Sequence, residues 1–318
     1  MNYRPVFISG CDCSGTIILG DMLGNTQWTV TTPESQFIHD MVIQLQMGNF
    51  QSTQAAAIWL TKNVKFIAWD LLLDQNQLAK LIDLQNPSHA INNLVAAYAL
   101  QTHSEKDKAD VWIDHTNDSF KHHSVLKRLF PEARFIHVVR DGRAVCASIK
   151  PLTWGPNNAF QASRYWAERM EQALSVEVAE GDNCLRIHFE DLVNNPSVTL
   201  AEVCKFIDIP FSPTMLTGGG LKQPNSTQQV DDLCGKPAEI RSTNDWKNCL
   251  CQAEIRDFES NPLSHDLLTN MNYSPVYEHP PQLSATRILS RYGHHFLYYL
   301  YNGFHQRHNL KPTLPSGY

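Results

Sequence analysis

The stretch that decides the fold is "FISGCDCSGTIILG", residues 7–20. It continues the apolar run "RPVFISG" (4–10), which is typical of a strand buried on both faces of a parallel sheet. Small and polar residues then indicate a tight turn, and the apolar spacing that follows predicts a helix over Ser14 to Leu23. A strand, a turn and a helix start together predict a loop whose backbone amides can bind phosphate or sulfate.

This turn is unusual for an anion site, because it carries Asp12 and no Lys or Arg. It also lacks the nucleotide-binding pattern GxxxxGK[ST], since Gly15 is followed by Thr16 and Ile17. That argues against an ATPase, a GTPase or a kinase. Any anion would be held mainly by backbone N–H groups, with Gly15 allowing close approach of the chain. An ordinary strand-to-helix turn is the alternative at this point.

The rest of the chain alternates between two patterns. Three further apolar runs have the length of strands: "VWIDHT" (111–116), "ARFIHVVRD" (133–141) and "CLRIHFED" (184–191). Helical spacing is found at 35–47, 143–149, 159–179 and 246–259. Strands that alternate with helices predict an α/β fold with a mainly parallel sheet. Because ligands bind beyond the carboxyl ends of such strands, the polar residues that follow them should converge on one site.

Composition excludes several classes of protein. The 318 residues are 42% hydrophobic and 18% charged, which suits one large domain or two small ones. The net charge of -6 and pI of about 6.1 argue against a nucleic-acid-binding protein. No apolar run reaches the ~18 residues that a spanning helix needs, and "MNYRPVFISG" lacks the zones of a signal peptide. We therefore expect a cytoplasmic protein whose eight cysteines are reduced, with no metal required.

A second motif lies in "FIHVVRDGRAVCASI" (135–149). Arg140 stands where a buried strand emerges, and Ser148 follows about two helical turns later. Both side chains could bind one phosphate group, Arg140 through charge-assisted hydrogen bonds and Ser148 through its hydroxyl. The alternative is a structural pair between Arg140 and Asp141 at a capped helix.

Together the two motifs resemble those of the sulfotransferase family that uses 3'-phosphoadenosine 5'-phosphosulfate (PAPS). The family's loop reads PRSGTT or PKSGTT, and the aligned segment here is "DCSGTI" (12–17). The family's RDxRxVxxS motif is matched in full by "RDGRAVCAS" (140–148). The segment "TTPESQFI" (31–38) resembles the largely bacterial branch, in which a Glu follows Pro. The resemblance covers roughly residues 4–273.

The resemblance implies a P-loop-type three-layer sandwich around a central, mainly parallel sheet. It implies that the loop holds the 5'-phosphosulfate, through Cys13, Ser14, Gly15, Thr16 and Ile17. Arg140 and Ser148 would hold the 3'-phosphate, and Arg241 would add a weaker contact from a basic loop. Glu34 would be the general base, and His115 or His39 are the alternatives for that role. The structural alternative is that Glu34 only caps the helix that opens near Ser35.

Two cations of the family are absent. Cys13 stands where the loop has Lys or Arg, and His115 stands where the family's "DKTP" has Lys. The candidates for a replacement charge are His115, Arg143, Lys222, Lys236 and Arg241.

The activity implied by the resemblance is transfer of a sulfuryl group from PAPS to a hydroxyl or amine, with release of 3'-phosphoadenosine 5'-phosphate (PAP). We expect a small-molecule acceptor, such as a natural product or a glycan. The alternative is a degenerate protein that binds PAPS or PAP without transfer.

The chain is predicted to divide at its C-terminal end. Residues 1–276 would form the sulfotransferase domain, with a long loop over 217–241. Residues 277–318 would form an extension whose aromatic stretch, 291–304, packs on that domain or on a second copy in a homodimer. The same stretch could instead contact lipid or cover the acceptor pocket.

Overall fold

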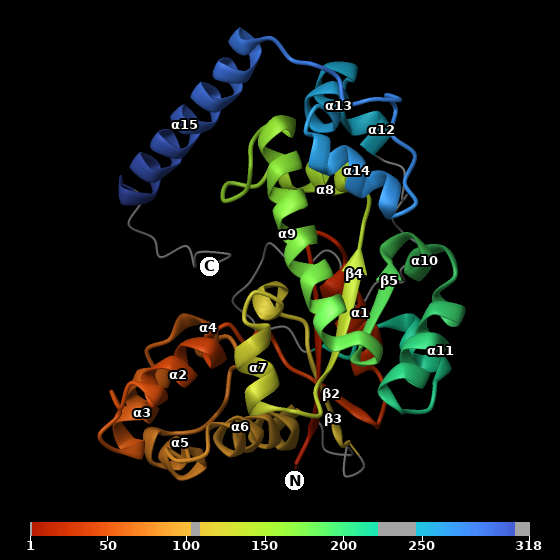
Figure 1. Ribbon diagram of the computed structural model, residues 1–318. Helices are drawn as coiled ribbons and strands as arrows, with labels where there is room; N and C mark the ends of the chain where they lie inside the picture. The colour runs from red at the N-terminus through yellow and green to blue at the C-terminus, as the bar shows by residue number, and fades with distance from the viewer. Residues whose placement is uncertain (1, 103–108, 222–245, 309–318) are drawn as a thin grey trace.

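The computed structural model describes residues 2–102, 109–221 and 246–308 (Figure 1). Its centre is a parallel sheet in the order β2-β3-β1-β4-β5. The strands are β1 (Arg4–Gly10), β2 (Thr29–Thr31), β3 (Val111–Asp114), β4 (Arg134–Val139) and β5 (Cys184–His188). This confirms the predicted α/β fold with a parallel central sheet. The strand from the opening sequence stretch, β1, occupies the middle of the sheet.

The helices follow the strands along the chain. Those of the first half are α1 (Thr16–Gly24), α2 (Phe37–Gln46), α3 (Thr53–Leu60), α4 (Val64–Ile67), α5 (Gln75–Leu81), α6 (Pro87–Thr102), η1 (Asn117–Ser119), α7 (His123–Leu129) and α8 (Gly142–Ile149). Those of the second half are α9 (Ala159–Glu180), η2 (Gly181–Asn183), α10 (Phe189–Asn194), α11 (Pro196–Ile207), η3 (Pro213–Thr217), α12 (Trp246–Cys249), α13 (Gln252–Glu259), α14 (Pro262–Asn270) and α15 (Ala285–His308).

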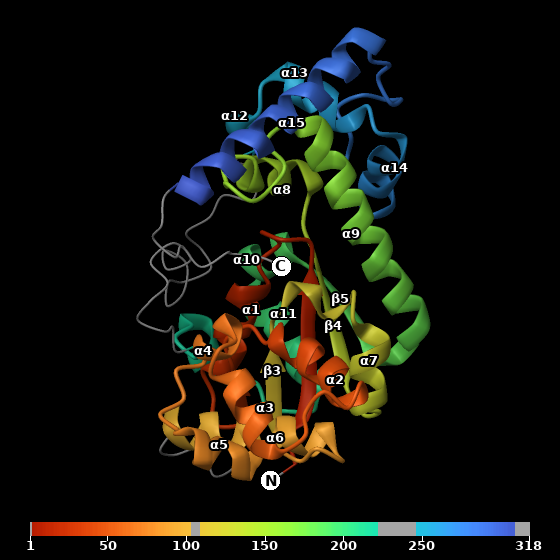
Figure 2. The same ribbon diagram turned by 90° about the vertical axis from the view of Figure 1, so that its left-hand side faces the viewer.

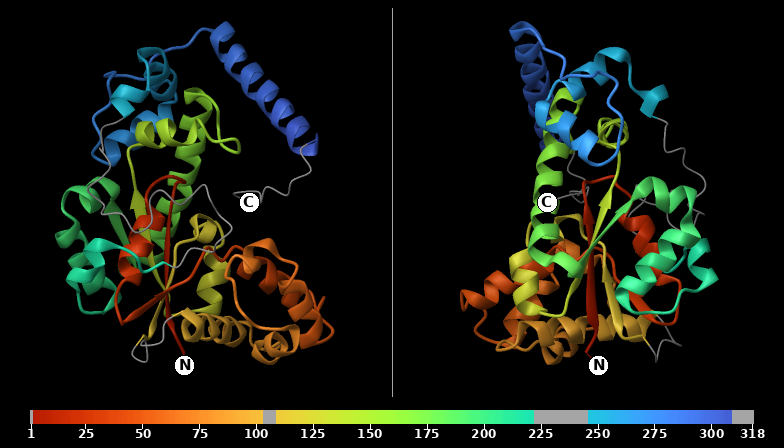
Figure 3. Two further views of the ribbon diagram at one scale, coloured as in Figure 1. Left: turned by 180° about the vertical axis from the view of Figure 1, so that it is seen from behind. Right: turned by 45° about the vertical axis from the view of Figure 1, so that its right-hand side comes forward.

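Side-chain alternation along the strands builds a core on each face of the sheet. Phe7, Trp112 and Phe135 pack in one cluster with residues of α2, α3, α5, α6, α7 and α9. Their neighbours Ile8 and Ile136 point the other way, into a cluster with α1, α10 and α11. The two helical layers are seen on opposite sides of the sheet in Figure 3, and the α2–α6 group faces the viewer in Figure 2. The three central strands, β3, β1 and β4, therefore contribute apolar side chains to both faces of the sheet.

A third core lies beyond the carboxyl end of the sheet. It joins α8 and the first half of α9 to α12, α13 and α14 around Trp166 and Phe258, both fully buried. Gly142, the first residue of α8, fits here because a Cβ at that position would lie 2.6 Å from atoms of both aromatic rings. This packing fixes the start of α8, two residues after Arg140.

Some element boundaries differ from the prediction. The fourth predicted strand, 184–191, ends at His188 because α10 begins at Phe189. The predicted helix 246–259 breaks between α12 and α13, where Cys251 caps the second helix. In the described part of the chain, no helix is both long and apolar enough to cross a membrane.

The last described helix, α15, contacts the body through its first turns. Tyr292 packs edge-on against Phe160 with ring centroids 5.5 Å apart. Arg287 and Arg291 each form an ion pair of 2.7 Å with Asp257. In Figure 1 the later turns of α15 lie apart from the other helices, to one side of the molecule. The domain boundary at residue 276 stays a prediction.

Candidate anion-binding site

The loop between β1 and α1 is shaped for close approach of a ligand. Cys13 and Gly15 both have positive φ, 65° and 97°, so the chain turns sharply on either side of Ser14. Thr16 and Ile17 are the first residues of α1, whose N-cap is Gly15. The first N–H groups of a helix have no partner within it and carry the positive end of its dipole. The loop therefore offers backbone donors to an anion.

The hydroxyl of Ser14 is placed to contact an anion in this loop. Its side chain is 1% exposed, and its hydroxyl oxygen has no hydrogen-bond partner within the described residues. Buried polar atoms in proteins are almost always hydrogen-bonded, so an orphaned hydroxyl inside an anion-binding turn fits a bound phosphate or sulfate oxygen.

Arg140 links the loop to the second motif. Its Nη1 donates to the backbone carbonyl of Cys13 at 2.6 Å and to the hydroxyl of Ser148 at 3.4 Å. Its guanidinium also lies 4.6 Å from the ring centroid of Phe189, and the residue is only 7% exposed. The carboxyl ends of β1 and β4 thus converge, and they bring the loop, Arg140 and Ser148 into one site.

Asp12, the acid of the loop, is turned toward other elements. The hydroxyl of Tyr165 donates to one of its carboxylate oxygens, and Asn117 Nδ2 donates to the other at 3.2 Å. Arg169 Nη2 lies 3.7 Å from the same carboxylate. Asn117 also accepts the hydroxyl hydrogen of Thr16 at 2.9 Å, so η1 holds the loop at two points.

Glu34 lies just beyond the carboxyl end of β2. Its carboxylate accepts a hydrogen bond of 2.6 Å from Gln36 and lies 3.8 Å from Lys65 Nζ. The next residue, Ser35, donates its N–H to Thr116 at 2.8 Å and its hydroxyl to Asp114. Glu34 is therefore tied to the end of β3, but its carboxylate is directed toward α4. Its role as general base stays a prediction.

The two histidine alternatives occupy different surroundings. His115 is 2% exposed and packs against Gly20 of α1, where an added Cβ would lie 3.1 Å from the imidazole. Neither ring nitrogen of His115 has a hydrogen-bond partner within the described residues. His39 stacks on His122 with ring centroids 3.4 Å apart. Burial and the nearby His39 lower the pKa of His122 to about 4.

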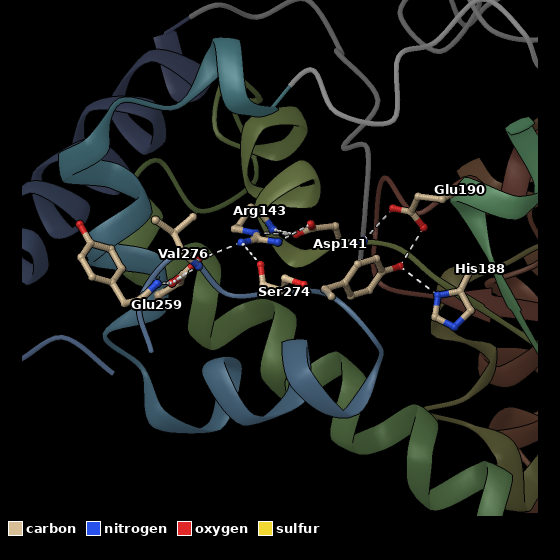
Figure 4. A network of polar contacts seen from close by, with 9 residues as sticks. Asp141, Arg143, His188, Glu190, Glu259, Ser274 and Val276 are labelled. Atoms are coloured by element: carbon tan, nitrogen blue, oxygen red, sulfur yellow. Dashed lines mark hydrogen bonds and ion pairs between the residues drawn. The ribbon is translucent and has the colours of Figure 1, made fainter. Parts of the chain in front are cut away.

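Arg143 cannot replace the loop cation, because it is committed to a buried network (Figure 4). It pairs with Asp141 at 2.7 Å and with Glu259 at 3.0 Å, and it is 3% exposed. Its guanidinium lies 4.1 Å from the ring centroid of Trp246. Burial opposes its charge, but Asp141 and Glu259 outweigh this and raise the pKa of Arg143. This candidate was wrong, and the residue is structural.

A second branch of this network holds the start of α8 against α10. Glu190 accepts the N–H of Asp141 at 3.1 Å and the hydroxyl hydrogen of Tyr273 at 2.8 Å. His188 Nδ1 lies 3.1 Å from the oxygen of the same Tyr273 hydroxyl. Burial and then Glu190 raise the pKa of Tyr273, so the phenol remains a donor. The residue after Arg140 is thereby fixed from two sides.

Three candidate residues lie outside the described residues: Lys222, Lys236 and Arg241. Within the described ranges, no three His, Cys, Asp or Glu side chains gather as a metal site. The residues missed from the sequence are Arg169 and Asn117, together with the contact of Tyr165 with Asp12. An unpaired acid in an anion loop was a signal that such partners must exist.

Comparison with known sequences identifies a family. The model of the sulfotransferase family matches residues 5–213. Protein-tyrosine sulfotransferase A of Caenorhabditis elegans is 25% identical over 211 residues, which is 62% of this chain and 55% of that protein. The chain spans about half the length of the curated relatives it matches.

Comparison with solved structures supports the fold. The sulfotransferase domain of the Synechococcus olefin synthase superposes with a TM-score of 0.57 at 20% identity, covering 86% of this chain and 96% of that domain. The sulfotransferase domain of the curacin biosynthetic pathway gives the same TM-score at 17% identity, covering 86% of this chain and 99% of that domain.

Proposed function

Because the chain belongs to the sulfotransferase family, we propose that it transfers a sulfuryl group from PAPS to an acceptor hydroxyl or amine. The observation that carries this proposal is the position of Arg140, which contacts the loop at Cys13 and the motif residue Ser148 at once. One site thus combines a helix N-terminus, an orphaned hydroxyl and a buried guanidinium, which together suit a doubly phosphorylated nucleotide.

The roles of the residues follow from these contacts. The N–H of Ser14 already donates to the carbonyl of Cys11 at 3.0 Å, so the amides of Gly15 to Ile17 and the Ser14 hydroxyl would bind the 5' end of PAPS. Arg140 with Ser148 would bind its 3'-phosphate. When bound, PAPS supplies the sulfuryl group and PAP as the leaving group. The protein's contribution is to hold that group in line with the acceptor and to stabilise the charge that develops. Glu34 is the proposed group that accepts the acceptor's proton.

The acceptor is proposed to be a small neutral or cationic molecule, of the natural-product or glycan class. Glu34, Asp12 and Asp118 follow the ends of three neighbouring strands. They outnumber the two cations paired with them, Lys65 and Arg169, and a net negative surround disfavours anionic acceptors. A second candidate is the phenol of a tyrosine, which is favoured by the similarity to protein-tyrosine sulfotransferases at 25–26% identity. The cytoplasmic location and a homodimer stay predictions.

The proposal is tested by incubating the protein with PAPS and a panel of alcohols, amines, phenols and tyrosine peptides. Acceptor-dependent PAP, measured by mass spectrometry, is the expected result. Arg140→Ala should weaken PAP binding by about 10- to 100-fold, because that is the affinity lost with one hydrogen bond to a charged group. Arg128→Ala, an exposed position on α7, is the matched control.

Two outcomes would change the conclusion. PAP binding without acceptor-dependent PAP release across the panel would favour the degenerate binding protein, for which Cys13 in the place of the family's loop cation is the supporting observation. Absence of PAP binding by the wild-type protein would refute the proposal.

A further inference from the structure

Asp12 poses an electrostatic problem for the proposed site. Its carboxylate is 19% exposed and lies two residues before Ser14, in the loop that would hold the anionic end of the nucleotide. A carboxylate in such a loop repels an anion unless a positive charge compensates it, and the repulsion is strong in a partly buried setting. In the family's loop Pro stands in the place of Asp12 and Lys or Arg in the place of Cys13, so the loop of this chain has one acid more and one cation fewer.

A positive charge reaches Asp12 from a different element. Arg169 lies on α9, with Nη2 3.7 Å from an Asp12 carboxylate oxygen, and its side chain is 20% exposed. Tyr165 lies one helical turn earlier on the same face of α9, and its hydroxyl donates to Asp12. The Arg169 guanidinium in turn lies 3.3 Å from that hydroxyl oxygen. Two residues of α9 thus lie against the Asp12 carboxylate.

A second acid fixes the arginine in this position. Arg169 Nη1 forms an ion pair of 2.8 Å with Asp118 of η1, next to Asn117, which also donates to Asp12. Burial opposes the charge of Arg169, but Tyr165, Asp12 and Asp118 outweigh it and raise the pKa of Arg169. Burial and Asp12 also raise the pKa of Tyr165, which therefore keeps its proton as a donor. The arginine is held charged and in place before any ligand arrives.

We propose that Arg169 is a positioning residue that compensates, from helix α9, the negative charge that Asp12 brings into the loop. By binding Asp12 together with Tyr165, it turns the carboxylate away and neutralises it, so that the loop amides and Ser14 can accept an anion. The inference rests on the proposed function, and it concerns how this chain's loop accepts PAPS without a basic residue of its own.

The proposal predicts a dependence between two positions that a merely structural arginine would not produce. Arg169→Gln leaves Asp12 uncompensated and should weaken PAP binding at least about tenfold, the size of one charge-assisted contact. Asp12→Asn removes the charge that needs compensation, so it should bind PAP as tightly as wild type or tighter. In the double variant the loss caused by Arg169→Gln should largely disappear.

The experiment measures PAP affinity by isothermal titration calorimetry for wild type, R169Q, D12N and D12N/R169Q, with thermal unfolding of each as a check of folding. Arg164→Gln is the matched control, because Arg164 is exposed on the same helix, 5.9 Å from the ring centroid of Tyr292. R169Q is expected to lose at least tenfold, R164Q less than twofold, and the double variant should lie within about threefold of D12N.

Each other result decides against the inference. An R169Q affinity equal to wild type, or a double variant as weak as R169Q, would overturn it while leaving the proposed function intact. If R169Q does not fold, D12N alone tests the inference. Weaker PAP binding by D12N than by wild type would then overturn it, because it would mean that the Asp12 carboxylate does not repel the anion. Failure of wild type to bind PAP overturns the proposed function and this inference with it.

Discussion

At the scale of single residues, Glu34 is the group whose chemistry most needs a test. Lys65 lies 3.8 Å from its carboxylate, and Gln36 donates to it at 2.6 Å. Glu34→Gln keeps the shape and removes the basicity. We expect kcat to fall by about 10²- to 10⁴-fold, as for loss of a general base, with PAP affinity within threefold of wild type.

The measurement is steady-state kinetics with the best acceptor of the panel, alongside PAP titration. Glu132→Gln, an exposed position between α7 and β4, serves as the control. A kcat that stays within threefold of wild type would mean that another group, such as His39 or His115, accepts the proton.

Residue-level prediction from sequence worked where contacts are local and failed where they are not. The spacing of Arg140 and Ser148 is a property of one strand and one helix, and the two side chains do meet at 3.4 Å. The partners of Asp12 come from 105 and 153 residues further along the chain. The packing of η1 and α9 beside β1 brings them near, and no local pattern encodes that.

At the scale of elements, the start of α1 depends on Gly15. Its φ of 97° lies in the left-handed region that favours glycine, and an added Cβ would lie 2.3 Å from Phe189 of α10. Gly15→Ala should therefore strain the loop and shift the helix N-terminus. We expect a loss of about 1–3 kcal/mol in unfolding free energy and at least tenfold weaker PAP binding. Urea denaturation and calorimetry measure the two effects.

Gly48 offers a comparison for the same substitution. It also has positive φ, 68°, but an added Cβ there meets no atom within 4 Å. Gly48→Ala should cost some stability and leave PAP affinity unchanged. Equal effects of the two substitutions on PAP binding would show that the α1 start has no special role.

Element-level prediction was best for the strands. Buried parallel strands read as continuous apolar runs, so β1, β3, β4 and β5 could be recognised. The helices over residues 53–102 were not predicted from the sequence. One signal was available there, because Asp74 and Gln77 have the spacing of the capping box that they form at the start of α5. The three-residue β2 was too short to show a pattern.

At the scale of the whole molecule, Glu259 joins the C-terminal helices to the motif that begins at Arg140. Glu259 is 0% exposed, pairs with Arg143 and accepts the N–H groups of Val276 and Tyr277. Glu259→Gln leaves a buried guanidinium partly uncompensated, so we expect a loss of about 3 kcal/mol in unfolding free energy. Urea denaturation measures it.

The matched control lies on the same helix. Glu254 pairs with Lys150 at 2.5 Å, and both side chains are about a quarter exposed, at 24% and 26%. Glu254→Gln should cost less than about 1 kcal/mol, as for other solvent-screened pairs. Losses of equal size for the two variants would contradict the assignment of Arg143 and Glu259 as a buried connection.

The central position of β1 also bears on how the chain folds. β1 is synthesised before both strands that flank it, because its partners are residues 111–114 and 134–138. Until these partner strands emerge from the ribosome, the apolar segment of β1 remains unpaired at both edges in the nascent chain. Such long-range pairing slows folding and exposes a surface prone to aggregation. Production of this protein should therefore depend on chaperones and on the rate of translation.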